Sequence, residues 1–424
     1  MSRTESSRVG VVGLGYVGLP LALAMTDAGH DVIGVDVDEE RVESLRDGSS
    51  YVTDIDDSAV EDALDAGLQP TTDYNDLAEV EAISICVPTP MRKTGAPDLS
   101  YVAASVDSLA DVIPRDCTVV LESTVYPGAT EEVVGGRLTE NGWTVGEDVF
   151  VAFSPERIDP GNEEYGPTEI PKVFGGVTEA CGDRVEALYE PVFDELVRVD
   201  SASEAEFVKL LENTFRIVNI GFINELAQIA DRLDVNIWNV IDAAATKPFG
   251  FMPFYPGPGL GGHCIPVDPM YLSWRANQQG VETRFIDLAK QVNREMPSHV
   301  VSRVTELLNA DGVPLPEADV LIVGVAYKAN VSDTRESPAF DVINMLGERG
   351  VSVEYHDPYV PALEVRDERF ESVPLDAERI ERADCVLILT DHSMLDTDSI
   401  VEHARLVFDT RNAIQEDIET VHKL

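Results

Sequence analysis

The fold of this chain of 424 residues is decided by the stretch Arg8-Val9-Gly10-Val11-Val12-Gly13-Leu14-Gly15-Tyr16-Val17-Gly18. Its first five residues are typical of a short buried strand, and residues 19–28 are typical of a helix. A second strand is expected at 31–35, and Asp36 follows it directly. A strand, a G-x-G-x-x-G turn, a helix, a strand and an acid, in this order, indicate a dinucleotide-binding βαβ unit.

We expect this turn to contact the cofactor through Gly13, Gly15, Tyr16, Val17 and Gly18. Glycines permit a tight turn and close approach of the backbone to a pyrophosphate at the helix N-terminus. A carboxylate at Asp36 would accept from the ribose hydroxyls and would repel a 2′-phosphate, so NAD is favoured over NADP. Arg41 weakens that discrimination slightly; it flanks the adenine or pairs with a neighbouring acid.

The alternation of strands and helices continues to about residue 200. Strands are expected at 82–87, 117–122, 149–153, 172–176 and 195–199, and a helix at 100–111, which gives a mainly parallel sheet of about eight strands. Ligands of such sheets bind beyond the carboxyl ends of the strands. Thr89, Thr124 and Glu156 each follow a strand and are therefore candidates for the cofactor side, the alternatives being a turn hydroxyl or a solvated acid.

A long amphipathic helix is expected at 205–233, and Ser203 and Glu206 have capping-box spacing before it. Lys209 and Asn213 are four residues apart and share a face of this helix. Nearly thirty helical residues span roughly 45 Å, which is long for one small domain. The helix is therefore expected to link domains and to pack against a second copy in a homodimer.

The loop Pro256-Gly257-Pro258-Gly259-Leu260-Gly261-Gly262-His263-Cys264-Ile265-Pro266-Val267-Asp268-Pro269 is the strongest chemical candidate. Its glycines allow positive φ and close approach to a ligand. Cys264, with His263 before it and Asp268 four residues on, is either a nucleophile or an inert buried thiol.

A second α/β unit is expected after the linker-like segment 311–316. Its first strand, at 319–325, is followed by Gly324-Val325-Ala326-Tyr327-Lys328, which lacks G-x-G-x-x-G, so a second dinucleotide site is not indicated. Lys328 and Arg335 lie just past this strand. Two cations there suggest a phosphate or carboxylate ligand, or contacts reaching back to the first domain.

The charge and the cysteine content of the chain exclude some classes of function and favour others. The chain has 78 acidic and 31 basic residues, a net charge of −47, and the acids are dispersed. A nucleic-acid partner is disfavoured, and a salt-loving host is favoured, because salt screens self-repulsion. Five scattered cysteines indicate neither a disulfide framework nor a metal site. With no membrane span and no secretory signal apparent, we expect a cytoplasmic protein.

Four segments together resemble the UDP-glucose/GDP-mannose dehydrogenase family. They are Ser154-Pro155-Glu156-Arg157, the helix from Lys209 through Asn213 to Asn219-Ile220-Gly221-Phe222-Ile223-Asn224-Glu225, the loop Gly261-Gly262-His263-Cys264, and Asp333-Thr334-Arg335-Glu336-Ser337-Pro338. The resemblance implies two Rossmann-like, doubly wound α/β domains joined by a long central helix and a helical dimerisation segment. The domains are expected at 1–200 (NAD), 201–310 (central, with the cysteine loop) and 317–424 (UDP-sugar).

The cysteine loop also bears on the sugar. UDP-glucose enzymes of the family usually have Gly-Gly-Ser-Cys-Phe-x-Lys-Asp, whereas this chain has His263, and Val267 in place of the lysine. That variant resembles the branch that oxidises UDP-N-acetylhexosamines, UDP-GlcNAc or UDP-ManNAc, and residues 248–259 look closest to the UDP-GlcNAc members. UDP-glucose 6-dehydrogenase is the alternative.

The family reaction oxidises the C6 hydroxymethyl of a UDP-sugar to a carboxylate and reduces two NAD. A covalent route through a Cys264 thiohemiacetal and thioester would let one site perform both oxidations. Lys209 and Asn213 would stabilise the oxyanions, Asp268 would anchor a water or orient Lys209 as base, and Glu156 and Thr124 would position the hydrolytic water. His263 either lowers the thiol pKa or contacts the sugar.

The resemblance also implies the ligand contacts. The cofactor set adds Asp36, Arg41, Thr89, Thr124 and Arg335 to the glycine turn, with no metal. The substrate set is Glu156, Arg157, Lys209, Asn213, Tyr255, Gly257, Gly259, Gly261, His263 and Lys328, with the loop glycines offering backbone N–H groups. The uronate would enter a surface polysaccharide or a glycoprotein glycan.

Two other readings remain open from the residues. A 2-hydroxyacid or 6-phosphogluconate-type dehydrogenase would need a lysine base but no cysteine, and would yield one NADH per substrate. A non-catalytic NAD- and nucleotide-sugar-binding regulator would turn nothing over. Lys209, Asn213, Cys264 and Asp268 together argue against the regulator, because a binding protein needs no thiol.

Overall fold

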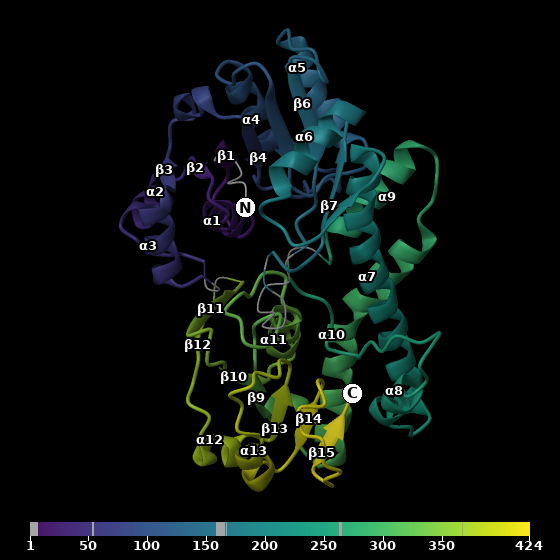
Figure 1. The fold of residues 1–424 in the computed structure, drawn as a ribbon. Helices are drawn as coiled ribbons and strands as arrows, with labels where there is room; N and C mark the ends of the chain where they lie inside the picture. The colour runs from purple at the N-terminus through teal and green to yellow at the C-terminus, as the bar shows by residue number, and fades with distance from the viewer. Residues whose placement is uncertain (1–6, 53–54, 158–165, 167, 263–264, 367) are drawn as a thin grey trace. The chain divides into compact units, whose positions relative to one another are not determined.

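The computed structural model describes residues 7–52, 55–157, 166, 168–262, 265–366 and 368–424 (Figure 1). The chain forms two compact units. The first comprises Met1–Glu212 and Met270–Glu282, and the second comprises Asn213–Pro269 and Thr283–Leu424.

The first unit is built on a sheet of eight strands in the order β3-β2-β1-β4-β5-β6-β7-β8. All neighbouring strands in it are parallel except β6 and β7, which are antiparallel. The strands are β1(Arg8–Val12), β2(Asp31–Val35), β3(Gln69–Thr71), β4(Ala82–Ile85), β5(Cys117–Leu121), β6(Val149–Phe153), β7(Lys172–Gly176) and β8(Leu196–Arg198).

Helices connect these strands, as the alternating pattern predicts. They are α1(Gly18–Asp27), α2(Glu39–Arg46), α3(Asp57–Ala66), α4(Ser100–Ala110), α5(Gly136–Glu140) and α6(Glu179–Tyr189), with a 3₁₀ turn η1(Tyr74–Glu79) and a π-helical turn η2(Thr130–Gly135). Strands β1, β4, β5 and β6 are almost wholly buried, which explains their near-continuous apolar sequences.

The second unit is a smaller parallel sheet of five strands, ordered β10-β9-β13-β14-β15. An antiparallel hairpin of β11 and β12 accompanies it. Its strands are β9(Asp319–Val323), β10(Ser352–His356), β11(Ala362–Val365), β12(Glu368–Glu371), β13(Cys385–Ile388), β14(Val407–Asp409) and β15(Val421–Lys423). Its helices are α8(Ile237–Ala245), α10(Arg284–Ala310), α11(Pro338–Glu348), α12(Ala377–Arg382) and α13(Thr397–His403), with the short turn η3(Leu315–Glu317). The predicted fold class, α/β with two Rossmann-like parts, is confirmed.

Helix α7(Ala202–Arg232) belongs to both units, because the division falls between Glu212 and Asn213. Helix α9(Asp268–Gln278) likewise begins in the second unit and continues in the first. Along α7 the apolar residues occupy two sides. Leu210, Ile217 and Ile223 are buried, whereas Phe207, Leu211, Phe215, Phe222 and Ile229 are exposed.

The predicted capping box at Ser203 and Glu206 is wrong. The Ser201 hydroxyl accepts from the Glu204 N–H, and the Glu204 carboxylate accepts from the Asp200 N–H, so the cap lies two residues earlier. Glu206 is instead fully buried, and its carboxylate accepts from the N–H of Gly128 and from the N–H and hydroxyl of Thr130. Burial raises the pKa of Glu206 to about 7, against these three hydrogen bonds.

A relay of buried asparagines fixes the start of the glycine-rich loop in the second unit. Asn224 on α7 accepts from the Gly257 N–H at 2.9 Å and donates to Asn293 of α10 at 2.8 Å. Asn293 in turn donates to the carbonyl oxygens of Ile217 and Ala289. Both asparagines are buried, so these bonds replace the water that the amides lose on folding.

Among the described residues, none of the helices combines the length and apolar character that crossing a bilayer requires. Cys86, Cys117, Cys181 and Cys385 are buried free thiols.

The asparagine relay gives a stability prediction. Asn224→Leu leaves the Gly257 N–H and the Asn293 side-chain oxygen buried without their partner, at about 1–3 kcal/mol each. Thermal unfolding should therefore shift down by roughly 5–10 °C, by the scaling for a unit of this size. Asn239→Leu, on the exposed side of α8, is the matched control and should change little. Equal midpoints for the two variants would contradict the relay.

Candidate functional site

The three glycines of the first turn are required for different reasons. Gly13 has φ of 91°, and a Cβ there would lie 2.7 Å from the Cys86 carbonyl oxygen. A Cβ on Gly18 would lie 1.8 Å from the Gly13 carbonyl oxygen, so helix α1 packs directly onto the turn. A Cβ on Gly15 meets nothing within 4 Å. Gly15 thus leaves open space beside the N–H groups of a helix start, which suits a pyrophosphate.

Asp36 lies at the end of β2, buried, where the sequence places the ribose-binding acid. Its carboxylate accepts from the N–H of Leu14 and of Asp38. Arg41 lies 3.6 Å from Asp36 and 3.5 Å from Asp38, and its guanidinium covers the Tyr51 ring. The alternative in which Arg41 pairs with neighbouring acids is therefore present in the structure, and Tyr16 is half-exposed beside the same turn.

Thr89 and Thr124 both follow strands of this sheet, as predicted. Thr89 is buried, and its carbonyl oxygen accepts from the Tyr271 hydroxyl of α9 at 2.6 Å. The Ser123 hydroxyl donates to the Val87 carbonyl at 2.6 Å, which fixes the segment that presents Thr124.

Glu156, after β6, is brought together with Lys209 of α7. The Lys209 ammonium donates to the main-chain carbonyl of Glu156 at 2.6 Å. The neighbouring Arg157 pairs with Glu212, also on α7, and donates to the Pro171 carbonyl. Four residues of the predicted site or its flank are thus held in one part of the first unit.

The sequence missed a buried charge cluster beside Glu156. Lys172, on β7, pairs with Glu122 at 2.8 Å and lies 3.7 Å from the Glu156 carboxylate. The Tyr189 hydroxyl donates to Glu122. Burial alone would lower the pKa of Lys172, but Glu122 and Glu156 outweigh it and raise that pKa, while burial raises the pKa of Glu122. A lysine opening an otherwise apolar strand was the available signal.

In the second unit the structure joins two predicted catalytic residues. The Asn213 amide donates to the Asp268 carboxylate at 2.6 Å, and both side chains are buried. Asp268 opens helix α9, four residues after Cys264. Cys264 and His263 themselves lie outside the described residues.

The glycines of the loop pack against the protein itself. A Cβ on Gly261 would lie 2.6 Å from Tyr327, and one on Gly259 3.1 Å from Pro338. The Gly262 N–H donates to the Arg335 carbonyl, and the Gly257 N–H to Asn224. The expectation that these two N–H groups point at a substrate is therefore wrong, because buried N–H groups need protein partners when the loop packs this tightly.

Arg411 is a second residue that the sequence did not single out. A Cβ on Gly257 would lie 2.7 Å from its guanidinium, and its Nε donates to the Leu389 carbonyl. Burial lowers the pKa of Arg411. A guanidinium against the glycine-rich loop is suited to a phosphate. No motif surrounds Arg411, so only the fold reveals it.

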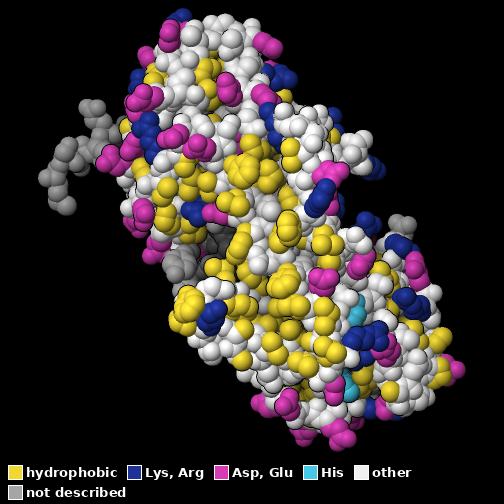
Figure 2. Space-filling model, turned by 90° about the vertical axis from the view of Figure 1, so that its right-hand side faces the viewer, with side chains coloured by type: hydrophobic (Ala, Val, Ile, Leu, Met, Phe, Trp, Pro, Cys, Tyr) yellow, Lys and Arg dark blue, Asp and Glu magenta, His cyan; other side chains and the backbone are white. Residues whose placement is uncertain are grey.

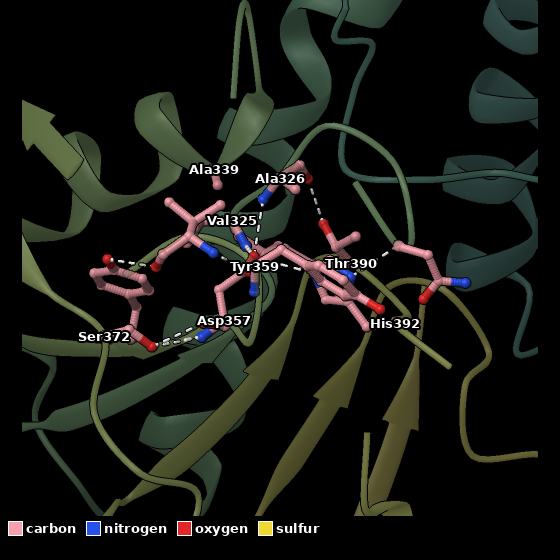
Figure 3. Close-up of polar contacts among 12 residues, drawn as sticks. Val325, Ala326, Ala339, Asp357, Tyr359, Ser372, Thr390 and His392 are labelled. Carbon is pink, nitrogen blue, oxygen red and sulfur yellow. Dashed lines mark hydrogen bonds and ion pairs between the residues drawn. The ribbon is translucent and has the colours of Figure 1, made fainter. Parts of the chain in front are cut away.

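The second unit has its own acid after its second strand, Asp357, and Figure 3 shows the polar contacts around it. Its carboxylate accepts from the N–H groups of Val325, Ala326, Tyr359 and Val360 and from His392. Burial would raise the pKa of Asp357, but the bonds from His392 and the backbone hold it below its usual value. Because the His392 Nδ1 accepts from the Asn330 N–H, its Nε2 carries the proton. Five donors saturate this acid, which agrees with the lack of a second dinucleotide fingerprint.

The remaining predicted residues of the second unit are placed as follows. Lys328 is half-buried after β9. Arg335 forms a bidentate pair with Asp333. Tyr255 is half-exposed, stacks on Trp238 and donates to Asp242.

Comparison with known families covers most of the chain. Residues 7–193 match the NAD binding domain of the UDP-glucose/GDP-mannose dehydrogenase family. Residues 203–295 match its central domain, and residues 321–416 match its UDP binding domain.

Several known proteins are similar to this chain over most of its length. A UDP-N-acetyl-D-mannosamine dehydrogenase of Methanococcus maripaludis is 34% identical over 98% of this chain and 95% of its own. A UDP-N-acetyl-D-glucosamine 6-dehydrogenase of Pseudomonas aeruginosa is 36% identical over 84% of this chain and 83% of its own. The solved UDP-D-ManNAc dehydrogenase of Pyrococcus horikoshii superposes with a TM-score of 0.89 at 32% identity and covers 98% of both chains. The chain belongs to the UDP-glucose/GDP-mannose dehydrogenase family and is an NAD-dependent oxidoreductase of a UDP-sugar.

Proposed function

We propose that this enzyme oxidises the C6 hydroxymethyl of a UDP-N-acetylhexosamine to the carboxylate, with two NAD reduced per sugar. The observation that carries the proposal is the bond between Asn213 and Asp268 at 2.6 Å. It fixes an amide donor of helix α7 to the acid four residues after Cys264. Lys209 lies one turn earlier on the same helix. A dehydrogenase that makes only an aldehyde or ketone needs no thiol at this place.

The covalent route follows from balancing the two oxidations. NAD, when bound, accepts the hydride. Loss of a proton from the C6 hydroxyl and of a hydride from C6 gives the aldehyde. The Cys264 thiolate adds to the aldehyde carbon, and the oxygen takes up a proton to give the thiohemiacetal. Loss of a second proton and hydride leaves a thioester. Water then hydrolyses the thioester to the carboxylate and restores the thiol.

The other residues have roles that suit their contacts. Lys209 and Asn213 carry N–H donors for the oxyanions of the tetrahedral intermediates. Glu156 accepts the proton of the hydrolytic water, with Thr124 helping to position it. Asp268 orients the Asn213 amide.

Cationic side chains and the glycine-rich loop are the groups that we assign to binding of the nucleotide. Arg411 and Lys328 both lie within residues 321–416, which match the family's UDP binding domain. We assign Arg411 to the diphosphate, because its guanidinium packs against Gly257. We assign Lys328 to the substrate, Tyr255 to the edge of the nucleotide site and Arg335 to the cofactor side.

The N-acetylhexosamine is supported by two independent observations. His263 and Val267 replace the serine and lysine that UDP-glucose enzymes usually have. The similar proteins from Methanococcus and Pseudomonas carry names for UDP-ManNAc and UDP-GlcNAc. The uronate product suits a surface polysaccharide or a glycoprotein glycan.

A coupled assay tests the activity. Purified protein in high KCl is given NAD and, separately, UDP-GlcNAc, UDP-ManNAc, UDP-GalNAc and UDP-Glc. We expect two NADH per sugar and the highest kcat/KM on an N-acetylhexosamine. Cys264→Ser should lose uronate formation, by a factor on the order of 10³ or more for a covalent nucleophile, while NAD binding is retained as the control. One NADH per sugar, preference for UDP-Glc, or undiminished uronate in the variant would each refute a stated part of the proposal.

An exposed apolar stripe on α7 supports a homodimer. Phe207, Leu211, Phe215, Phe222 and Ile229 lie along one side of the helix, each 45–56% exposed. Figure 2 shows hydrophobic side chains gathered on the side of the molecule that faces the viewer. Contiguous apolar surface of this kind marks an interaction site. The occupant we propose is the same stripe of a second copy, since a twofold axis pairs a surface with itself.

Phe222→Glu tests the dimer. A charge buried in a symmetric apolar interface costs at least ~3 kcal/mol, which weakens association more than about 100-fold. Sedimentation should therefore give a dimer for the wild type and the monomer mass of 46.3 kDa for the variant. Tyr101→Glu, at an equally exposed position of α4, is the control and should stay dimeric. A monomeric wild type, or a dimeric Phe222→Glu, would be inconsistent with this interface.

We further propose a cytoplasmic location in a host with a salty interior. The net charge of −47 and the dispersed acids support the salt, and four buried free thiols suit a reducing compartment. NAD and UDP-sugars are also cytoplasmic metabolites.

Salt dependence of stability tests the charge argument. The Debye length falls from about 10 Å at 0.1 M salt to 3 Å at 1 M, so self-repulsion in the folded state weakens. The thermal unfolding midpoint should rise steadily from 0.1 M to 2 M KCl. Sucrose at matched osmolality stabilises folded proteins without screening charge, so it is the control, and KCl should raise the midpoint further than sucrose does. A midpoint that is highest in dilute buffer would exclude a salt requirement.

A further inference from the structure

Lys172 is a buried cation of the first unit. It opens strand β7, is only 4% exposed, and its ammonium lies over the rings of Tyr189 and Phe193. A lysine is rarely buried to this degree unless anions compensate it. The ammonium of Lys172 therefore stays charged because of the anions beside it.

Two carboxylates that follow the neighbouring strands β5 and β6 compensate this charge. Glu122, at the end of β5, lies 2.8 Å from the ammonium and also accepts from the Tyr189 hydroxyl. Glu156, at the end of β6, lies 3.7 Å from it. Glu122 is thus the structural partner, and Glu156 is the second, partly exposed one.

Glu156 is contacted by Lys209, Arg157 and Lys172. Lys209 donates to its carbonyl oxygen, the Arg157 N–H donates to one carboxylate oxygen at 2.6 Å, and Lys172 faces the other. The first two contacts fix the backbone and one oxygen. Lys172 brings a full positive charge to the other oxygen from inside the protein.

We propose that Lys172 is a positioning residue for Glu156: it holds that carboxylate in place and ionised, so that Glu156 can take the proton of the hydrolytic water. This inference rests on the proposed function, because it needs Glu156 to act as the base. Lys172 itself touches neither substrate nor cofactor in this account.

The charge balance sets the sign of the effect. An opposite charge within about 4–6 Å favours the ionised form of a carboxylate. The titratable and charged groups that face Glu156 and Lys172 are Cys86 after β4, Glu122 after β5, Arg157 beside Glu156, Tyr189 on α6 and Lys209 on α7. Removing Lys172 takes away the positive charge that faces Glu156, which disfavours the ionised form of Glu156, while burial then favours the neutral form of Glu122.

The test compares pH profiles of kcat for the full-length enzyme. In Lys172→Met the acidic limb should move to higher pH by about one to two units, with KM for the sugar little changed. The double variant Lys172→Met with Glu122→Gln should move it in the same direction by no more than the single one. Lys172→Arg keeps the charge and should restore the wild-type limb. Lys93→Met, at an exposed loop position, is the matched control.

The double variant guards against a folding failure, because it removes both buried charges together. An infrared titration, taken as the difference from Glu156→Gln, measures protonation of this carboxylate without turnover. A limb and an infrared midpoint that stay at the wild-type pH in a folded variant would overturn the proposal. If the wild type oxidised no UDP-sugar, the proposed function would fail, and the infrared midpoint would still decide whether Lys172 holds Glu156 ionised.

Discussion

The structure depends on hydrogen bonds to the polar side chains that helix α7 buries. Glu206, Lys209, Asn213 and Asn224 lie within an arc of about 60° on the helix, at 3.6 residues per turn. Each bonds to a partner in its own unit: Glu206 to residues 128–130, Lys209 to the Glu156 carbonyl, Asn213 to Asp268 and Asn224 to the Gly257 N–H. Loops that carry the proposed chemistry are thus fixed by bonds that the helix cannot lose without stranding a buried polar group.

The same principle explains why the two Rossmann-like parts have different functions. Asp36 and Asp357 occupy equivalent places after the second strand of a βαβ unit. Asp36 accepts two backbone N–H groups and lies beside a turn with open space at Gly15. Asp357 accepts from four N–H groups and from His392, so it stabilises its own turn, and our proposal assigns the diphosphate to Arg411 instead.

The charge of the chain is handled in two ways. At the surface, acids are dispersed and many pair with the few arginines, as in Arg198 with Asp183 and Glu186. Such exposed pairs contribute little each, so net repulsion remains. In the interior, Lys172 compensates both Glu122 and the proposed base Glu156, and the low dielectric there strengthens these interactions.

The sequence alone determined the class of fold and the cofactor turn, because these depend on local patterns, and it supplied the candidates for the reactive groups. Glycine spacing dictates the turn after β1, and apolar periodicity predicts most strands within two residues of their ends, as at 149–153 and 172–176. That Lys209 and Asn213 share a face of helix α7 follows from the helical repeat. Cys264 and His263 remain sequence predictions, since they lie outside the described residues.

Only the tertiary structure decided which polar groups face one another. Glu206 has cap spacing but is buried against residues 128–130, because the helix starts earlier, at Ser201. Lys172, Glu122 and Arg411 belong to no sequence motif. Lys172 pairs with Glu122 and Glu156, which are 50 and 16 residues away in the sequence, and Arg411 bonds to Leu389. Gly257 and Gly262 face protein partners rather than open space. Hydrogen bonds and ion pairs between distant segments are set by packing, and a linear pattern carries no record of that.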